Sequence, residues 1–170
     1  FKAKEIEGEL KYAVRRQEET IYHRQLKMTS PALNRFRDLV LYNLEAGQAV
    51  LTDNNDIRIY TDGKEKFHAL IEEMKRAKKY IHVQYYIIRN DEVWQDIEKV
   101  LIEKAHEGVE VRVLFDSMGC RTMHKRDWDR LKRKGIRVAE FFPAILGQLQ
   151  MRVNYRNHRK IVVIDGKVGF

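Results

Sequence analysis

The stretch "YIHVQYYIIRNDEVWQDIEKVLIEKAHEGVEVRVLF", residues 80–115, decides the fold class. Residues 80–88 are rich in β-branched and aromatic side chains, which favour a strand. Residues 91–108 begin with acidic side chains and end at Gly108, a pattern typical of a helix. "VEVRVLF", residues 109–115, predicts the next strand. A strand, a helix and a second strand in succession indicate an α/β domain with a mainly parallel sheet.

The same alternation continues on both sides of this stretch. Before it, "IRIY" at 57–60 predicts a strand, and residues 61–79 predict a turn followed by a helix. After it, residues 124–135 predict a basic helix and residues 136–142 a fourth strand. The helix within 61–79 has one apolar face, formed by Phe67, Leu70, Ile71 and Met74.

The N-terminal part differs from this pattern. Residues 1–26 predict a charged, amphipathic leader helix. Residues 31–46 predict a shorter helix with Pro31 in its first turn. We therefore expect a helical leader over residues 1–50 and an α/β half-domain over residues 51–170.

The C-terminal part predicts a loop at 143–150, and then "MRVNY" and "KIVVI" as a strand pair or one interrupted strand. Asp165-Gly166 is a hairpin signal, so "KVGF" should begin a returning strand. The sequence begins with Phe1 and ends within that strand, so we expect the chain to be a fragment of a longer protein.

Composition narrows the possible partners. The chain of 170 residues has a formal charge of +8, which favours either nucleic acid or an anionic lipid surface. Cys120 is the only cysteine, so an intrachain disulfide or a cysteine-rich metal site is excluded. No run reaches the roughly 18 apolar residues that span a bilayer.

The residues "NHRK", 157–160, carry the candidate chemistry. Side chains two positions apart on a strand point to the same face, so His158 and Lys160 should project together. A neutral imidazole can form a covalent phosphohistidine, and a lysine offsets charge on the phosphate oxygens. Asn157 could add a hydrogen bond. Asp165 would face the opposite side of an ideal strand, unless the hairpin turn redirects it.

His158, Lys160 and Asp165 match the H-x-K-x-x-x-x-D (HKD) motif of the phospholipase D superfamily. The wider segment "RVNYRNHRKIVVIDGKVGF" resembles the first such motif of bacterial cardiolipin synthases. Residues 57–88, 103–120 and "FFPAI" at 141–145 also resemble that family, in the same order. The resemblance covers about residues 45–170, and it implies a phospholipase D-like sheet flanked by helices.

This resemblance implies a phosphatidyltransferase that needs no metal and no cofactor. A phosphatidyl group would pass between two phosphatidylglycerol molecules through a phosphohistidine, releasing glycerol. By analogy His158 is the nucleophile or the acid–base partner, Lys160 holds phosphate, and Asp165 supports the histidine. The family acts at the bacterial cell membrane, with the catalytic region on the cytoplasmic side. Its members carry two membrane-spanning helices before that region, and residues 1–45 would be the remainder of the link.

The family uses two HKD motifs, because in-line displacement needs groups on both sides of phosphorus. None of the other five histidines has a lysine two positions later, so this sequence carries one half-site. The expected partner is the missing second half or a second copy of the chain. Two alternatives stay open: a nuclease or other phosphodiesterase of the same superfamily, and a catalytically silent half-domain. The family-like flanks make nucleic acid the less favoured partner.

Three further features are weaker candidates. Asp116 follows the strand at 109–115, at a carboxyl end where α/β sheets place their sites, although a turn-capping role is more common. Gln84 could line the substrate pocket, but strand parity does not decide it. The helix at 123–134 has seven basic residues counting His124, and could rest on an anionic membrane; a solvated face is the ordinary alternative.

Overall fold

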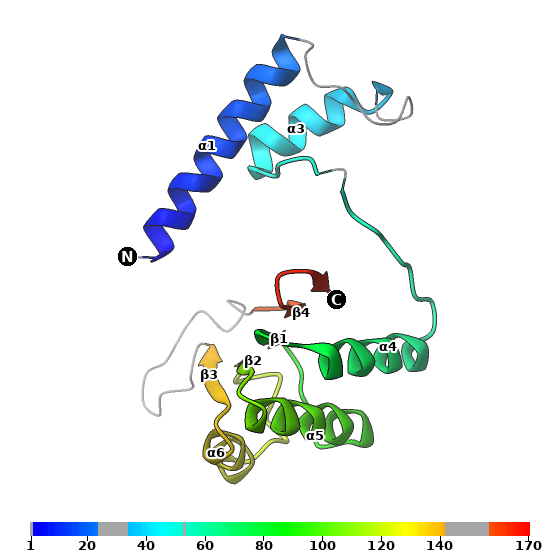
Figure 1. The fold of residues 1–170 in the computed structure, drawn as a ribbon, viewed down its shortest axis with the longest axis vertical. Helices are drawn as coiled ribbons and strands as arrows, with labels where there is room; N and C mark the ends of the chain where they lie inside the picture. Colours follow the sequence, from blue (N-terminus) through cyan, green and yellow to red (C-terminus); the bar gives the residue numbers. More distant parts are fainter. Residues whose placement is uncertain (1, 24–33, 53, 142–156) are drawn as a thin grey trace. The chain divides into compact units, whose positions relative to one another are not determined.

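The computed structural model describes residues 2–23, 34–52, 54–141 and 157–170. The chain divides into two compact units, residues 1–58 and residues 59–170. Figure 1 traces their elements along the chain. No helix in the described ranges is long and apolar enough to cross a membrane.

The first unit contains two helices, α1 (Lys2–Tyr22) and α3 (Arg37–Gly47). A small core of Val14, Ile21 and Leu44 lies between them. The side chain of Gln17 pairs with the backbone of Leu51 in both directions, at 2.9 and 2.6 Å. Both predicted helices are therefore present. The described part of the second is α3, from Arg37 to Gly47, and the expected start at Pro31 lies outside the described residues.

The second unit is built on a five-stranded sheet with the order β3-β2-β1-β4-β5. Its strands are β1 (Tyr80–Tyr85), β2 (Glu110–Asp116), β3 (Arg137–Phe141), β4 (Lys160–Ile164) and β5 (Val168–Gly169). Strands β1, β2 and β3 are parallel to one another, whereas β4 runs antiparallel to both β1 and β5. The predicted fold class, a mixed α/β sheet with flanking helices and a helical leader, is confirmed.

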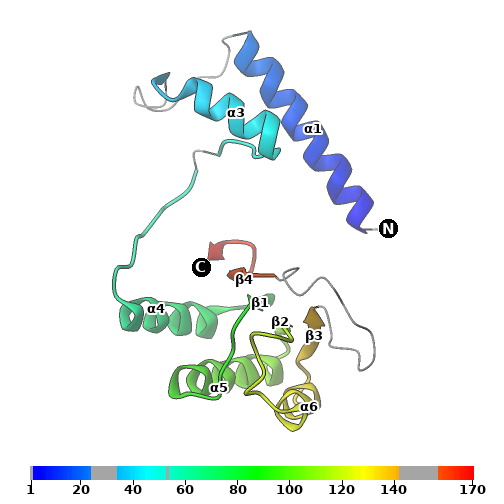
Figure 2. The same ribbon diagram turned by 180° about the vertical axis from the view of Figure 1, so that it is seen from behind.

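Three helices cover one face of this sheet: α4 (Gly63–Arg76), α5 (Glu92–His106) and α6 (Lys125–Arg133). Figures 1 and 2 show them on the same side of the strands. Strand residues that point toward them are buried: Ile81, Val83, Tyr85, Val111, Val113, Phe115, Val162 and Ile164. Phe115 stacks on Trp128 of α6 with ring centroids 3.9 Å apart. Burial of this apolar face is what holds the helices on the sheet.

Local signals set the ends of these helices. Asp62 accepts hydrogen bonds from the amides of Lys64 and Glu65, and so caps α4. Asp91 caps α5 through the amide of Trp94. Gly108 follows α5 with a φ of 88°, a left-handed conformation that glycine adopts without strain.

One strand prediction is wrong. Residues 57–60 form no strand, and Ile57 and Ile59 are 80% and 85% exposed. Their alternating pattern is favourable for a strand, but alternation alone supplies no neighbouring strand, and none of the pairings between the described strands includes these residues. The predicted loop at 143–150 and strand at 151–155 lie outside the described residues.

Candidate functional site

His158 and Lys160 lie at the edge of the sheet where the parallel strands end. Lys160 opens β4 and pairs with Tyr85, the last residue of β1. The Tyr86 amide donates to the Arg159 carbonyl at 3.0 Å, which extends the pairing to the residue between the two candidates. This carboxyl edge is where α/β sheets place their ligand sites.

The side chains of His158 and Lys160 project together, as their spacing predicts. Lys160 Nζ lies 3.4 Å from His158 Nδ1 and 3.3 Å from the His158 carbonyl oxygen. Both side chains are exposed, so a ligand could reach them. Within the described residues no carboxylate pairs with Lys160, and its positive charge is therefore available to an anion.

Tyr86 completes this arrangement, and the sequence reasoning missed it. Its ring centroid lies 4.3 Å from that of His158, with the planes tilted by 53°. Lys160 Nζ lies 5.6 Å from the same ring centroid. The sequence offered one signal for Tyr86: it directly follows β1, and the carboxyl end of a strand is where α/β sheets place their sites.

Asp116, the last residue of β2, binds the backbone at this edge of the sheet. Its carboxylate is almost fully buried, at 1% exposure. One oxygen accepts from the Met118 amide at 2.9 Å, and the other accepts from the Asn157 amide at 3.1 Å. Asp116 therefore connects the end of β2 to the residue before His158. This bond fixes the backbone of Asn157, which is half-buried.

The segment after Asp116 also holds the backbone next to Tyr86. The Cys120 thiol accepts from the Ile88 amide at 3.2 Å and donates to the Tyr86 carbonyl at 3.6 Å. A Cβ on Gly119 would lie 1.9 Å from that carbonyl oxygen, so only glycine permits this approach. Burial raises the pKa of Cys120 to about 11, which keeps it a neutral thiol.

Asp165 lies at the other end of β4. Its carboxylate accepts from three backbone amides that lead into β1: Lys78 at 2.8 Å, Lys79 at 2.8 Å and Tyr80 at 2.9 Å. These bonds lower its pKa, and the bond from Tyr80 makes the largest contribution to that shift. Asp165 and Gly166 have φ values of 54° and 68°, and the Lys167 amide bonds to the Ile164 carbonyl, as in a type I′ turn. Among the described residues, no hydrogen bond joins Asp165 to His158.

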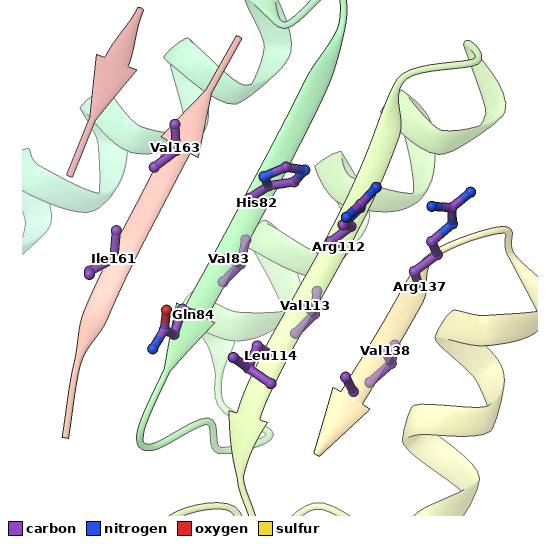
Figure 3. Close-up of a pocket in the computed structure, with 11 residues that line it drawn as sticks. His82, Val83, Gln84, Arg112, Val113, Leu114, Arg137, Val138, Ile161 and Val163 are labelled. Carbon is purple, nitrogen blue, oxygen red and sulfur yellow. The ribbon is translucent and has the colours of Figure 1, made fainter. Parts of the chain in front are cut away.

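Gln84 lies on the face of the sheet away from the helices. It pairs with Ile161, whereas Lys160 pairs with Tyr85, so the two side chains point to opposite faces. Figure 3 shows this open face, where His82, Arg112 and Arg137 form a row across β1, β2 and β3. A shallow hollow of about 490 Å³ lies here. It is a separate region from the His158 site.

Glu110 holds that basic row together. Its carboxylate contacts His82 at 3.2 Å, Arg112 at 2.9 Å and Arg137 at 3.3 Å. The hydrogen bond from Arg112, followed by that from His82, lowers the pKa of Glu110 to about 2. In the described part of the chain, no three His, Cys, Asp or Glu side chains gather as a metal site.

Comparison with known proteins gives consistent matches. The family model described as "Cardiolipin synthase, PLD-like domain" matches residues 70–170. A cardiolipin synthase of Oceanobacillus iheyensis is 43% identical over 161 residues, which are 95% of this chain and 33% of that protein. The major cardiolipin synthase ClsA of Bacillus subtilis is 40% identical over 157 residues, 92% of this chain and 33% of that protein.

A cardiolipin synthase of Staphylococcus aureus is 46% identical over 136 residues, 80% of this chain and 28% of that protein. The chain thus spans about a third of the length of these curated relatives. Among solved structures, NucT from Helicobacter pylori matches with a TM-score of 0.45 and 18% identity, over 62% of this chain and 64% of that one.

Proposed function

The chain belongs to the family described as "Cardiolipin synthase, PLD-like domain", and we propose that it supplies one half of a phosphatidyltransferase site. The observation that carries the proposal is the pair of His158 and Lys160, side by side and exposed at the carboxyl edge of the sheet. The imidazole can attack phosphorus, and the unneutralised ammonium can hold the phosphate oxygens.

The proposed reaction has two displacements at phosphorus. In the first, an imidazole nitrogen of His158 forms a P–N bond with phosphatidylglycerol, the P–O bond to the headgroup breaks, and the leaving glycerol takes a proton. In the second, the headgroup hydroxyl of another phosphatidylglycerol loses its proton and attacks phosphorus, and the P–N bond breaks. The products are glycerol from the first displacement and cardiolipin from the second, and the His158 side chain returns to its unmodified form.

Each displacement needs a proton donor or acceptor opposite the histidine. His158 cannot occupy both positions, so we propose that a second HKD half or a second copy of the chain supplies the other group. In this proposal Asp165 acts through the β4–β5 turn and the start of β1, and does not touch the substrate. Asp116 likewise acts through the backbone of Asn157.

We also propose that the substrate is met at an anionic membrane surface, on the cytoplasmic side of a bacterial membrane. The last turn of α6 and the residue after it carry exposed Lys132, Arg133 and Lys134. Arg130 is already committed to Glu98, with three hydrogen bonds of 2.8–3.0 Å. These three residues form an exposed basic group at the C-terminal end of α6, and this group can meet lipid headgroups.

Vesicle binding tests this membrane contact. The chain should bind phosphatidylglycerol vesicles better than neutral phosphatidylcholine vesicles, and less well as salt rises. Reversing Lys132 and Arg133 to glutamate should weaken binding at least about tenfold, since each basic residue near the surface contributes about 1 kcal/mol. Lys75 and Arg76, in the last turn of α4, are the matched control pair. Equal loss from both double variants would contradict a specific role of α6.

The chemistry is tested by incubating the chain with phosphatidylglycerol vesicles and measuring both lipids and protein by mass spectrometry. Water can donate the proton to the leaving glycerol when the second half is absent, so we expect a slowly formed phosphatidyl adduct on the native chain but not on His158→Ala. His82→Ala is the matched control, since His82 is another part-exposed strand histidine, on the open face. We expect no cardiolipin from the isolated chain, because one half-site lacks the second histidine.

His158-dependent cardiolipin synthesis would support the transfer and show that two copies complete the site. Absence of both adduct and cardiolipin would contradict the assignment of His158 as the nucleophile. The second candidate function is a phosphodiesterase or nuclease, favoured by the charge of +8. Cleavage of single-stranded DNA that depends on His158, without any lipid product, would select it.

A further inference from the structure

Tyr86 contacts both candidate catalytic side chains through its ring. The ring centroid lies 4.3 Å from the His158 imidazole and 5.6 Å from the Lys160 ammonium. The imidazole and the ammonium also meet each other, with Nζ 3.4 Å from Nδ1. The three groups therefore form one cluster, in which each side chain touches the other two.

Exposed lysine and histidine side chains ordinarily sample many rotamers, and ordering a lysine costs up to about 2 kcal/mol. A carboxylate would order this lysine, but it would also neutralise the charge that a phosphate needs. An aromatic ring attracts a cation through its quadrupole and leaves the net charge unchanged. The tilted contact between the two rings orients the imidazole in the same way, without a charge partner.

The position of the ring is itself fixed by backbone contacts. The Tyr86 amide donates to Arg159 at 3.0 Å, and its carbonyl accepts from Cys120. Gly119 packs directly under that carbonyl. The backbone of Tyr86 is therefore held by the residue before β4 on one side and by the segment after β2 on the other.

We propose that Tyr86 is a positioning residue, whose ring orients His158 and Lys160 toward an anionic phosphate while leaving the charge of Lys160 available. The consequence for catalysis rests on the proposed phosphatidyl transfer, but the geometry and the phosphate affinity do not. The ring carries this role and the hydroxyl does not, because the contacts that the described residues record are ring contacts.

The test uses the imidazole signals of the whole chain in NMR spectra, with the His158 signal assigned by its loss in His158→Gln. The Tyr86 ring should displace the His158 ring protons from their usual shifts. Tyr86→Leu should return them toward those values, and Tyr86→Phe should leave them displaced. The second pair on the same strand, Tyr80 and His82 with centroids 4.5 Å apart, is the control: Tyr80→Leu should move His82 and not His158.

Inorganic phosphate, titrated into each variant, measures the consequence for anion binding. Tyr86→Leu should weaken phosphate binding about two- to fivefold, the usual range for an exposed cation–π contact. Tyr86→Phe should bind as the native chain does, and Lys160→Met should bind more weakly than Tyr86→Leu. The His82 signal reports in each spectrum whether the sheet is folded, and Tyr86→Met replaces Tyr86→Leu if that variant does not fold.

Unchanged His158 signals and unchanged phosphate affinity in a folded Tyr86→Leu or Tyr86→Met chain would overturn the proposal. Equal loss in Tyr86→Phe would also overturn it, since the hydroxyl would then carry the role. Neither readout needs turnover. A failure of lipid transfer therefore leaves this result unaffected, and the two proposals fail separately.

Discussion

Asp116 and Asp165 both place a carboxylate against backbone amides, at opposite ends of the sheet. Asp116 binds the amides of Met118 and Asn157, and Asp165 binds three amides before and at the start of β1. Each therefore stabilises the backbone that carries the site. At the scale of a residue, the hydrogen bonds of both carboxylates therefore indicate a structural role.

Asp116→Asn should destabilise the chain by about 1–3 kcal/mol, because the new amide group would face one of the two N–H donors. The amides of Met118 and Asn157 should exchange with solvent faster. Asp62→Asn is the control: both capping bonds of Asp62 use one oxygen, which asparagine retains, and asparagine is an equally good cap. Unchanged exchange at Asn157 in Asp116→Asn would contradict this role.

Asp165 should make the fold sensitive to acid. Its pKa in the folded chain is lowered from 3.8 by the bonds from Tyr80, Lys78 and Lys79. The stabilisation is therefore complete above about pH 4 and is lost as pH falls through the lower folded value. Asp165→Asn should lower stability by about 1 kcal/mol at neutral pH, a modest value because the site is partly open to solvent.

Urea unfolding between pH 7 and pH 3 measures this effect. The stability difference between the native chain and Asp165→Asn should shrink toward pH 3. Glu72→Gln removes only an exposed carboxylate paired with Lys75, and should change little at any pH. A constant difference between native and Asp165→Asn over the whole range would argue against the charge as the cause.

At the scale of elements, the segment between β2 and α6 links β1 to β4. Asp116 reaches Asn157, and Cys120 reaches the backbone at Tyr86 and Ile88. Tyr86 and Cys120 are 34 positions apart in the sequence, and Asp116 and Asn157 are 41 positions apart. The segment therefore holds the residues that flank both strands at the site, in addition to the direct pairing of β1 with β4.

Gly119→Ala should destabilise the chain by about 1–3 kcal/mol, because a Cβ 1.9 Å from the Tyr86 carbonyl oxygen forces the backbone to move. The His158 ring signals should shift with it. Gly63→Ala, in the first turn of α4 with nothing within 4 Å of its Cβ, should be neutral or stabilising by up to about 1 kcal/mol. Thermal unfolding of both variants measures the contrast, and equal midpoints would refute it.

At the scale of the whole molecule, the two units have separate cores. The larger core runs from Leu70 to Ile164 and includes the buried apolar residues of β1, β2 and β4. The smaller core consists of Val14, Ile21 and Leu44 from α1 and α3. No residue belongs to both buried sets, so folding of the sheet should not require the leader.

Residues 59–170 should therefore fold alone. We expect cooperative unfolding with a midpoint close to that of the sheet in the full chain, and the same ring displacement at His158. Circular dichroism and the imidazole spectra measure the two properties. Non-cooperative unfolding of residues 59–170, or loss of the His158 displacement, would mean that the leader contributes to the fold of the sheet.

Local pattern predicted the elements of this chain well. The helices α4, α5 and α6 and the strands β1 and β3 fall within their predicted ranges, and β2 ends one residue beyond its predicted range, because periodicity and capping are properties of neighbouring residues. The hairpin turn at Asp165-Gly166 followed for the same reason. The strand predicted at 57–60 failed, because alternation does not supply a pairing partner.

The sequence by itself determined that His158 and Lys160 project together, since their spacing of two on a strand is enough. It could not determine that β4 inserts antiparallel beside β1, because a register between distant strands depends on the whole packed core. That one pairing brings Tyr86 to His158 and Asn157 to Asp116, and carries Asp165 to the opposite end of the strand. The chemistry of the site was thus local, whereas its support was decided only by the tertiary structure.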